Sequence, residues 1–173
     1  IQMLHSVQKQ YVDYHHVRIS NEAVAECVRL AKRYIKDRRL PDSAIGLLDM
    51  TLSASKMGNE TGKKNVETLL AGLDEIEKDE KDLQEKTEEL KTLLFVMHNK
   101  LSPILLGVIP DEADIHELQE YEELAAYLRN ALNAILQFAE KKIEEVGIYE
   151  VAAVVASKTG IPIGKIQSQE KER

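Results

Sequence analysis

The sequence has no tryptophan and few aromatic residues of any kind, which make up 5% of its 173 residues. Proteins that bind single-stranded nucleic acid stack bases on such rings and surround the phosphates with lysine and arginine. In this chain the acidic side chains outnumber the basic ones, and the net charge is -7. Composition and charge together disfavour a nucleic-acid partner.

Cysteine and long apolar runs are also scarce. The single cysteine, Cys27, cannot form an internal disulfide, and no apolar run approaches the roughly 20 residues of a membrane-spanning helix. We therefore expect a cytoplasmic protein that binds no membrane. Because Cys27 belongs to an apolar helical stripe, it is expected to be a buried, inert thiol. The chain opens without a methionine and as if inside a helix, so we expect it to be part of a longer protein.

The common catalytic motifs are absent as well. The sequence contains no GxxxxGK[ST] loop, CxxC, HExxH or GxSxG. His15 and His16 are adjacent and so point in different directions, and we expect a surface position for them rather than a metal site with His5. These absences predict that the chain itself is not an enzyme and holds neither metal nor cofactor.

Glycine and proline occur 8 and 4 times and cluster at a few points, while helical periodicity fills the rest. The expected fold is therefore mainly all-α. Helices are predicted at 1–14, from the N-cap Ser20 or Asn21 to residue 35, from Pro41 onward, and up to a C-cap at Gly160. The polar stretch 56–64 is predicted as a break. Residues 17–19 alternate as in a very short strand, with Val146 as a candidate strand partner.

Two longer segments, 66–101 and 114–146, repeat apolar residues at alternating spacings of four and three, as in a coiled coil. Each has about 35 residues, so each helix would be about 50 Å long. Matched lengths favour one long antiparallel helical hairpin over two separate coiled-coil partners. Glu80 and Thr87 occupy core positions of the repeat, which predicts a weak place where the first helix could bend.

The connection between the two segments is unusually apolar. Pro103 and Pro110 stop the helices, and five apolar residues lie between them. They either fold back to plug the end of the hairpin or form a contact surface for a partner. These candidate partner-binding residues are Ile104, Leu105, Leu106, Val108 and Ile109.

Two separated stretches resemble one family. The first is YVDYHHVRISNEAVAECVRLAKRYIKDRRLPDSAIGLLDMTLS, and the second is VGIYEVAAVVASKTGIPIGKI. They are similar to the small lid subdomain of the first ring in Clp-type AAA+ unfoldases, the ClpA/ClpB/ClpC group, into which a coiled-coil middle domain is inserted. The resemblance implies a lid at 1–60 and 146–160, a middle-domain hairpin at 61–145, and the start of an inter-ring linker at 161–173. After about Pro162 we expect disorder or opportunistic packing.

The resemblance also implies a function. In the longer parent, the lid would close over ATP and magnesium held with neighbouring subunits of a hexamer, and the arm would contact an adaptor or co-chaperone while protein substrates are unfolded. The nucleotide-facing candidates are Leu40, Pro41, Asp42, Ala44 and Ile45. They begin a helix, whose first N–H groups favour anions. The alternative is that Ala44 and Ile45 are simply core and Pro41 only starts the helix.

Some positions depart from the family pattern: Ser43 replaces the usual lysine, Gly46 the usual aspartate, and Met50 the usual glutamate. These departures bear on the nucleotide contacts. The arm length lies between the ClpC-type and ClpB-type arms, so both a protease-partnered unfoldase and a disaggregase fit. The competing hypothesis is a free-standing helical hairpin, a structural or adaptor protein that self-associates through its seam.

Overall fold

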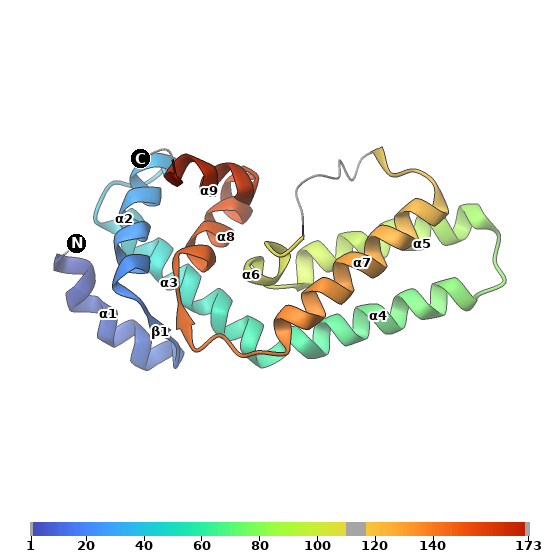
Figure 1. Cartoon of the computed structure of the whole chain (residues 1–173), viewed down its shortest axis with the longest axis horizontal. Coiled ribbons are helices and arrows are strands. Elements are labelled where there is room, and N and C mark those ends of the chain that lie inside the picture. The colour runs from blue at the N-terminus through green and yellow to red at the C-terminus, as the bar shows by residue number, and fades with distance from the viewer. Residues whose placement is uncertain (1, 110–116, 172–173) are drawn as a thin grey trace.

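The structure is a computed structural model that describes residues 2–109 and 117–171 (Figure 1). It is mainly helical with one very small sheet, as the sequence predicts. The helices and strands, in chain order, are α1 (Gln2–His15), β1 (Arg18–Ile19), α2 (Asn21–Tyr34), α3 (Asp42–Met57), the π-helix η1 (Gly58–Gly62), α4 (Lys63–Lys78), α5 (Leu83–Lys100), α6 (Pro103–Leu106), α7 (Tyr121–Ala139), β2 (Glu145–Val146), α8 (Ile148–Thr159) and α9 (Ile163–Lys171).

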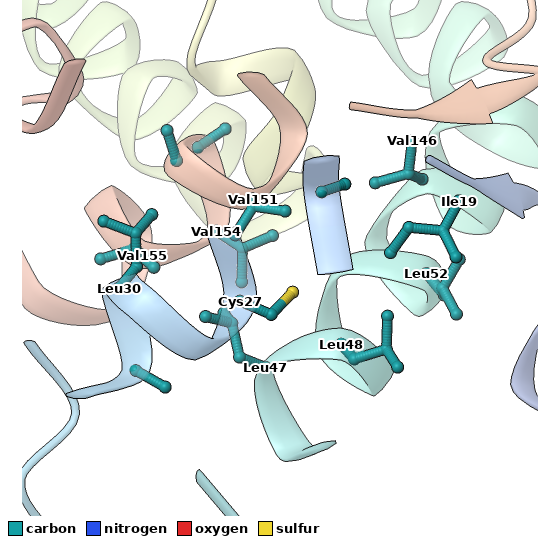
Figure 2. Close-up of a cluster of buried hydrophobic side chains, with 14 of the residues drawn as sticks. Ile19, Cys27, Leu30, Leu47, Leu48, Leu52, Val146, Val151, Val154 and Val155 are labelled. Carbon is teal, nitrogen blue, oxygen red and sulfur yellow. The ribbon is translucent and has the colours of Figure 1, made fainter. Parts of the chain in front are cut away.

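One core, called the first core below, combines the beginning and the end of the chain. Side chains from α1, α2, α3, α8 and α9 meet in it, and Figure 2 shows α2, α3 and α8 converging around Cys27. The buried residues of the first core are Leu4, Val17, Ile19, Ala23, Val24, Cys27, Leu30, Ala31, Ile35, Ala44, Leu47, Leu48, Leu52, Ala54, Ile104, Val146, Val151, Ala152, Ala153, Val154, Val155, Ile163 and Ile166.

The two strands close this core by pairing in parallel. Arg18 is opposite Glu145 and Ile19 is opposite Val146, so the expected pairing with Val146 is confirmed. The N–H of Ser20 donates to the carbonyl of Val146 at 3.0 Å. The sheet therefore fastens the returning chain beside the segment that it left more than a hundred residues earlier.

Two predicted helix caps are also confirmed. The hydroxyl of Ser20 accepts a hydrogen bond from the N–H of Ala23 at 3.1 Å, which satisfies one free amide at the start of α2. Gly160 ends α8 in the left-handed conformation, with φ at 75°, and its N–H donates to Ala156. Only glycine adopts this conformation without steric cost, so this position sets the end of the helix.

The predicted break at 56–64 is wrong, because α3, η1 and α4 form one continuous helical path. Gly58 and Gly62 both keep right-handed helical dihedral angles. Both glycines are buried, and a Cβ built on Gly62 would lie 2.8 Å from Cδ1 of Leu105. Glycine here allows close packing rather than ending the helix.

The expected hairpin of two 35-residue helices is also wrong. Helix α4 ends at Lys78, the chain reverses over residues 79–82, and α5 runs back beside α4 (Figure 1). Helix α7 packs against both, so among the described residues α4, α5 and α7 together form the body of the arm. The reversal falls where Glu80 occupies a core position of the repeat, and Asp82 starts α5 by accepting a hydrogen bond from the N–H of Glu85. A carboxylate cannot enter the seam without a partner, so the helix ends there.

The arm has its own core, called the second core below. Leucines of the heptad pattern dominate it, and Leu73, Leu90 and Leu128 are completely buried. The buried residues of the second core are Val66, Leu69, Leu73, Leu90, Met97, Leu101, Leu105, Ile109, Leu124, Ala125, Leu128, Ala131, Leu132 and Ile135. The coiled-coil pattern thus identified most of the buried positions, but Leu83, which lies on the same repeat, is 58% exposed, and the helices that share the buried face differ from those predicted.

The last segment folds back on the first core. Residues Ile163–Lys171 form α9, and Ile163 and Ile166 are buried against α8 and its neighbours. Of the two expectations for this stretch, packing describes residues 163–171, and residues 172–173 lie outside the described part of the chain. Its isoleucines are covered within the chain.

Candidate functional site

The start of α3 carries the five residues expected to face a nucleotide. Leu40 is 43% exposed, and Pro41 and Asp42 are also on the surface. Ala44 is fully buried in the first core, and Ile45 packs against that core as a half-buried side chain. The structure therefore brings three of the five to the surface and assigns Ala44 to packing.

The backbone amides at this helix start are mostly occupied already. The N–H of Ser43 donates to the carbonyl of Arg39, and those of Ala44 and Ile45 donate to that of Pro41, at 3.1, 3.1 and 3.0 Å. These three N–H groups therefore already have acceptors within the chain, and binding of phosphate or ribose at this helix start stays a prediction. Contacts with a ligand would instead use the exposed side chains.

A cavity of about 240 Å³ lies beside this helix start. Its polar lining is of mixed charge, with basic and acidic side chains facing the same space. The charged lining residues are Asp37, Arg38, Asp42, Asp49 and Lys158. Ligand pockets for whole small molecules usually measure about 300–1,000 Å³, so this cavity would take part of a nucleotide and leave the rest to another surface.

A hydrogen-bonded pair that the sequence did not suggest lies next to the cavity. His15 is only 5% exposed, and its Nε2 is 2.7 Å from Oδ1 of Asp49. The expectation of a surface position is wrong for His15, because its side chain turns toward Asp49 on α3. The same ring stacks on that of Tyr11, one turn earlier on α1. Both His15 and Asp49 lie in the first of the two stretches that resemble the family, which was the available signal for this pair.

Cys27 is not a reactive group. Its side chain is completely buried, and burial raises the pKa of the thiol to about 12, with the neighbouring Glu26 carboxylate adding to the shift. A thiol that stays protonated at neutral pH is a poor nucleophile, so the prediction of an inert cysteine is confirmed. Glu26 is itself buried and forms an ion pair with Arg29 on the same helix.

Within residues 2–109 and 117–171, no group of three or more histidine, cysteine, aspartate or glutamate side chains could hold a metal ion. Among the same residues, no helix is both long and apolar enough to cross a membrane.

The apolar segment proposed for partner binding does not lie at the tip of the arm. Residues 104–109 are at its base, between the arm and the first core, and the tip is the reversal at 79–82 (Figure 1). Ile104, Leu105 and Ile109 are 0, 2 and 9% exposed, whereas Leu106 and Val108 are half-buried. Ile104, Leu105 and Ile109 thus enter the two cores, and a partner contact through Leu106 and Val108 stays a prediction. The expectation that this segment lies at the tip of the arm is wrong, because the first long segment does not form one helix but reverses at 79–82.

A family model described as the AAA lid domain matches residues 1–96. The whole chain aligns with the chaperone protein ClpB of Oceanobacillus iheyensis at 30% identity and covers 19% of that protein. It aligns at 28% with the negative regulator of genetic competence ClpC/MecB of Bacillus subtilis, of which it covers 19%. It aligns at 27% with the ATP-dependent Clp protease ATP-binding subunit ClpC of Staphylococcus aureus, of which it covers 18%.

The chain thus spans about a fifth of the length of these curated relatives, and each alignment includes all of it. The matched segment 1–96 contains α1 to α4 and most of α5. Because the family model covers more than half of the chain, the protein belongs to the AAA lid domain family, and its relatives are Clp-type AAA+ chaperones.

Proposed function

We propose that this chain is the lid and the inserted middle arm of a cytoplasmic Clp-type ATPase, with the lid at 1–60 and 146–160, the arm at 61–145 and the beginning of an inter-ring linker at 161–173. One observation carries the proposal: the arm interrupts a single core. Strands β1 and β2, which flank the arm in sequence, pair with each other, and α8 packs on α2 and α3. An arm inserted in this way is displaced whenever the lid moves.

The proposed role of the small unit is to close over ATP and magnesium bound by other parts of the longer protein and by neighbouring subunits of a hexamer. The name of one relative describes an ATP-binding subunit. The exposed surface at Leu40, Pro41 and Asp42 would provide the contact, with Arg38 and Lys158 contributing positive charge at the adjacent cavity. Nucleotide hydrolysis would belong to a separate nucleotide-binding domain, and this chain would supply closure.

The arm is proposed to contact an adaptor or co-chaperone during the unfolding of protein substrates. Of the five apolar candidates, Leu106 and Val108 retain accessible surface. Leu106 also lines a cavity of about 440 Å³ between the base of the arm and the start of α9. Ile104 and Leu105 would support this surface from beneath.

The competing hypothesis of a free-standing hairpin that self-associates loses its main argument. It requires the leucine seam to be available to a second copy, but Leu73, Leu90 and Leu128 are completely buried among α4, α5 and α7. The lid-and-arm proposal needs no such exposure.

The nucleotide contact can be tested in the uninterrupted gene product with Leu40→Asp, because a carboxylate at an ATP-facing surface repels the phosphates. The expected result is a raised KM for ATP. The matched control is Leu83→Asp, since Leu83 is also an exposed leucine, 58% accessible, but lies in the arm. Equal KM values for wild type and Leu40→Asp would refute the contact, and ATP hydrolysis by residues 1–173 alone would refute the assignment of hydrolysis elsewhere.

The partner contact can be tested with Leu106→Asp in the same gene product. The expected result is loss of regulation by an adaptor or co-chaperone while basal ATP hydrolysis persists, with Leu83→Asp again as the control. Unchanged binding of the partner, measured by co-purification and by ATPase response, would exclude this surface.

A further inference from the structure

The short helix α6 lies between the two cores and contributes to both. Its second residue, Ile104, is fully buried in the first core, and the next residue, Leu105, is 2% exposed in the second core. Adjacent side chains on a helix point in directions about 100° apart, so one turn of helix can enter two cores at once. Neither core can shift relative to α6 without disturbing one of these side chains.

Gly107, which follows α6, lets the backbone approach α8 and α9 very closely. A Cβ built on Gly107 would lie 2.9 Å from the hydroxyl oxygen of Tyr149, 3.1 Å from Cβ of Ala153 and 3.3 Å from Cδ1 of Ile163. These distances are too short for an alanine without movement of the neighbours. The contact between the base of the arm and α8 is therefore tight.

Hydrogen bonds strengthen the same contact. The hydroxyl of Tyr149 on α8 donates to the carbonyl of Ile104 at 3.0 Å, and the hydroxyl of Ser102 donates to the carbonyl of Ala54 on α3 at 2.7 Å. Ser102 is 2% exposed, so its bond is shielded from water. The segment around α6 is thus bonded to two helices of the first core.

The opposite side of the arm base has a second attachment. The side chain of Asn59 in η1 donates to the carbonyl of Ile143 at 2.8 Å and accepts from the N–H of Ile143 at 2.6 Å. This pair of bonds joins the outgoing helix to the chain that returns from α7. These bonds and the continuous helical path through α3, η1 and α4 hold the base of the arm at more than one place.

We propose that the segment 102–107 is a coupling element that fixes the angle of the arm and makes it follow α8. The element transmits movement because it contacts α8 at Tyr149 and Ala153 and enters the second core through Leu105. The inference rests on contacts within the chain and does not require that the protein bind a nucleotide. Its failure would therefore leave the proposed function standing, and the reverse also holds.

The length of the arm makes such coupling measurable. Helix α4 has 16 residues and is about 24 Å long, so a rotation of about 10° at its base displaces its end by about 4 Å. A change of that size is visible in distances measured between paired spin labels. Positions Glu22 on α2 and Glu75 on α4 are exposed and accept labels after substitution by cysteine, and the buried, protonated Cys27 does not compete for the reagent.

The experiment compares Gly107→Ala with Gly46→Ala in the doubly labelled chain of 173 residues. Gly46 is the matched control, because a Cβ there meets nothing within 4 Å. Gly107→Ala is expected to shift and broaden the distance distribution between the labels, and Gly46→Ala to leave it unchanged.

Two results would overturn the proposal. The first is a folded Gly107→Ala variant, judged by circular dichroism, whose distribution matches that of the wild type. If Gly107→Ala does not fold, Tyr149→Phe alone decides, because it removes only the hydrogen bond to Ile104. A wild-type distribution in that variant is the second contradicting result, and a broadened one supports the coupling.

Discussion

The two cores of this protein are built in different ways. The first core joins residues from both ends of the chain and contains many alanine and valine side chains. The second core is formed by helices from one continuous region and consists mostly of leucines at heptad spacing. The difference teaches that local repetition suffices to build the arm, whereas the small unit depends on contacts between residues far apart in sequence.

The largest effect is expected when one buried leucine is replaced in each core. Leu48→Ala in the first core and Leu128→Ala in the second each remove a completely buried side chain, and each is expected to lower the free energy of unfolding by about 2–5 kcal/mol. Hydrogen exchange would show where the loss falls, with faster exchange in α2, α3 and α8 for Leu48→Ala and in α4, α5 and α7 for Leu128→Ala. Identical exchange maps for the two variants would mean that the cores unfold as one.

The attachment between the two regions is tested by Asn59→Ala. The variant loses both hydrogen bonds to Ile143 and leaves a partly buried backbone N–H and carbonyl without this partner. The expected cost is about 2 kcal/mol, measured by urea unfolding. Thr61→Ala in the same π-helix is the control, since it removes an exposed hydroxyl that bonds within its own helix. Equal stability of the two variants would show that the attachment adds little.

The first core should also respond to alkaline pH through Cys27. Burial raises the pKa of its thiol from 9.0 to about 12, so above pH 9 the unfolded chain releases this proton while the folded chain keeps it. Stability from this group is complete below pH 9 and falls as the pH rises toward 12, by about 1.4 kcal/mol per pH unit. Urea unfolding at pH 8 and pH 10 would measure the loss, and Cys27→Ala should show a smaller dependence. A variant with the same pH slope as the wild type would contradict the assignment.

The smallest effect is expected at the surface of the arm. Nη2 of Arg129 on α7 lies 2.7 Å from Oδ1 of Asp74 and 2.8 Å from Oε2 of Glu77, both on α4. All three side chains are accessible to solvent. Arg129→Met should lower the free energy of unfolding by about 0.5 kcal/mol. The difference from the wild type should shrink in high salt, because ions screen exposed pairs. A loss as large as that of Leu128→Ala would show that charges rather than leucines hold the arm.

Much of the fold was predictable from local patterns. Ser20 begins α2 because its hydroxyl accepts a hydrogen bond from the N–H of Ala23, and Gly160 ends α8 because it adopts the left-handed conformation. Both helix ends are as predicted. The prediction of a short strand at residues 17–19 with Val146 as its partner was also correct, since alternating apolar residues beside a turn are typical of a short strand. The family resemblance identified the segments on both sides of the arm as one unit.

The errors have a common cause in distant contacts. Gly58 and Gly62 looked like a break, but Leu105 packs against the helix at that point, and its contact explains the glycines. His15 looked exposed because its partner Asp49 is 34 residues away. The tip of the arm was misplaced because the repeat shows which faces are buried but not which helices share them.

The sequence by itself determined that the protein is helical, where its apolar faces lie and which family its two flanking segments resemble, because helical periodicity and capping depend on neighbouring residues. Only the tertiary structure decided that the first long helix reverses at 79–82 and that α6 inserts Ile104 and Leu105 into different cores. Those outcomes depend on how apolar faces are buried against one another, and a linear pattern describes each face without its partner.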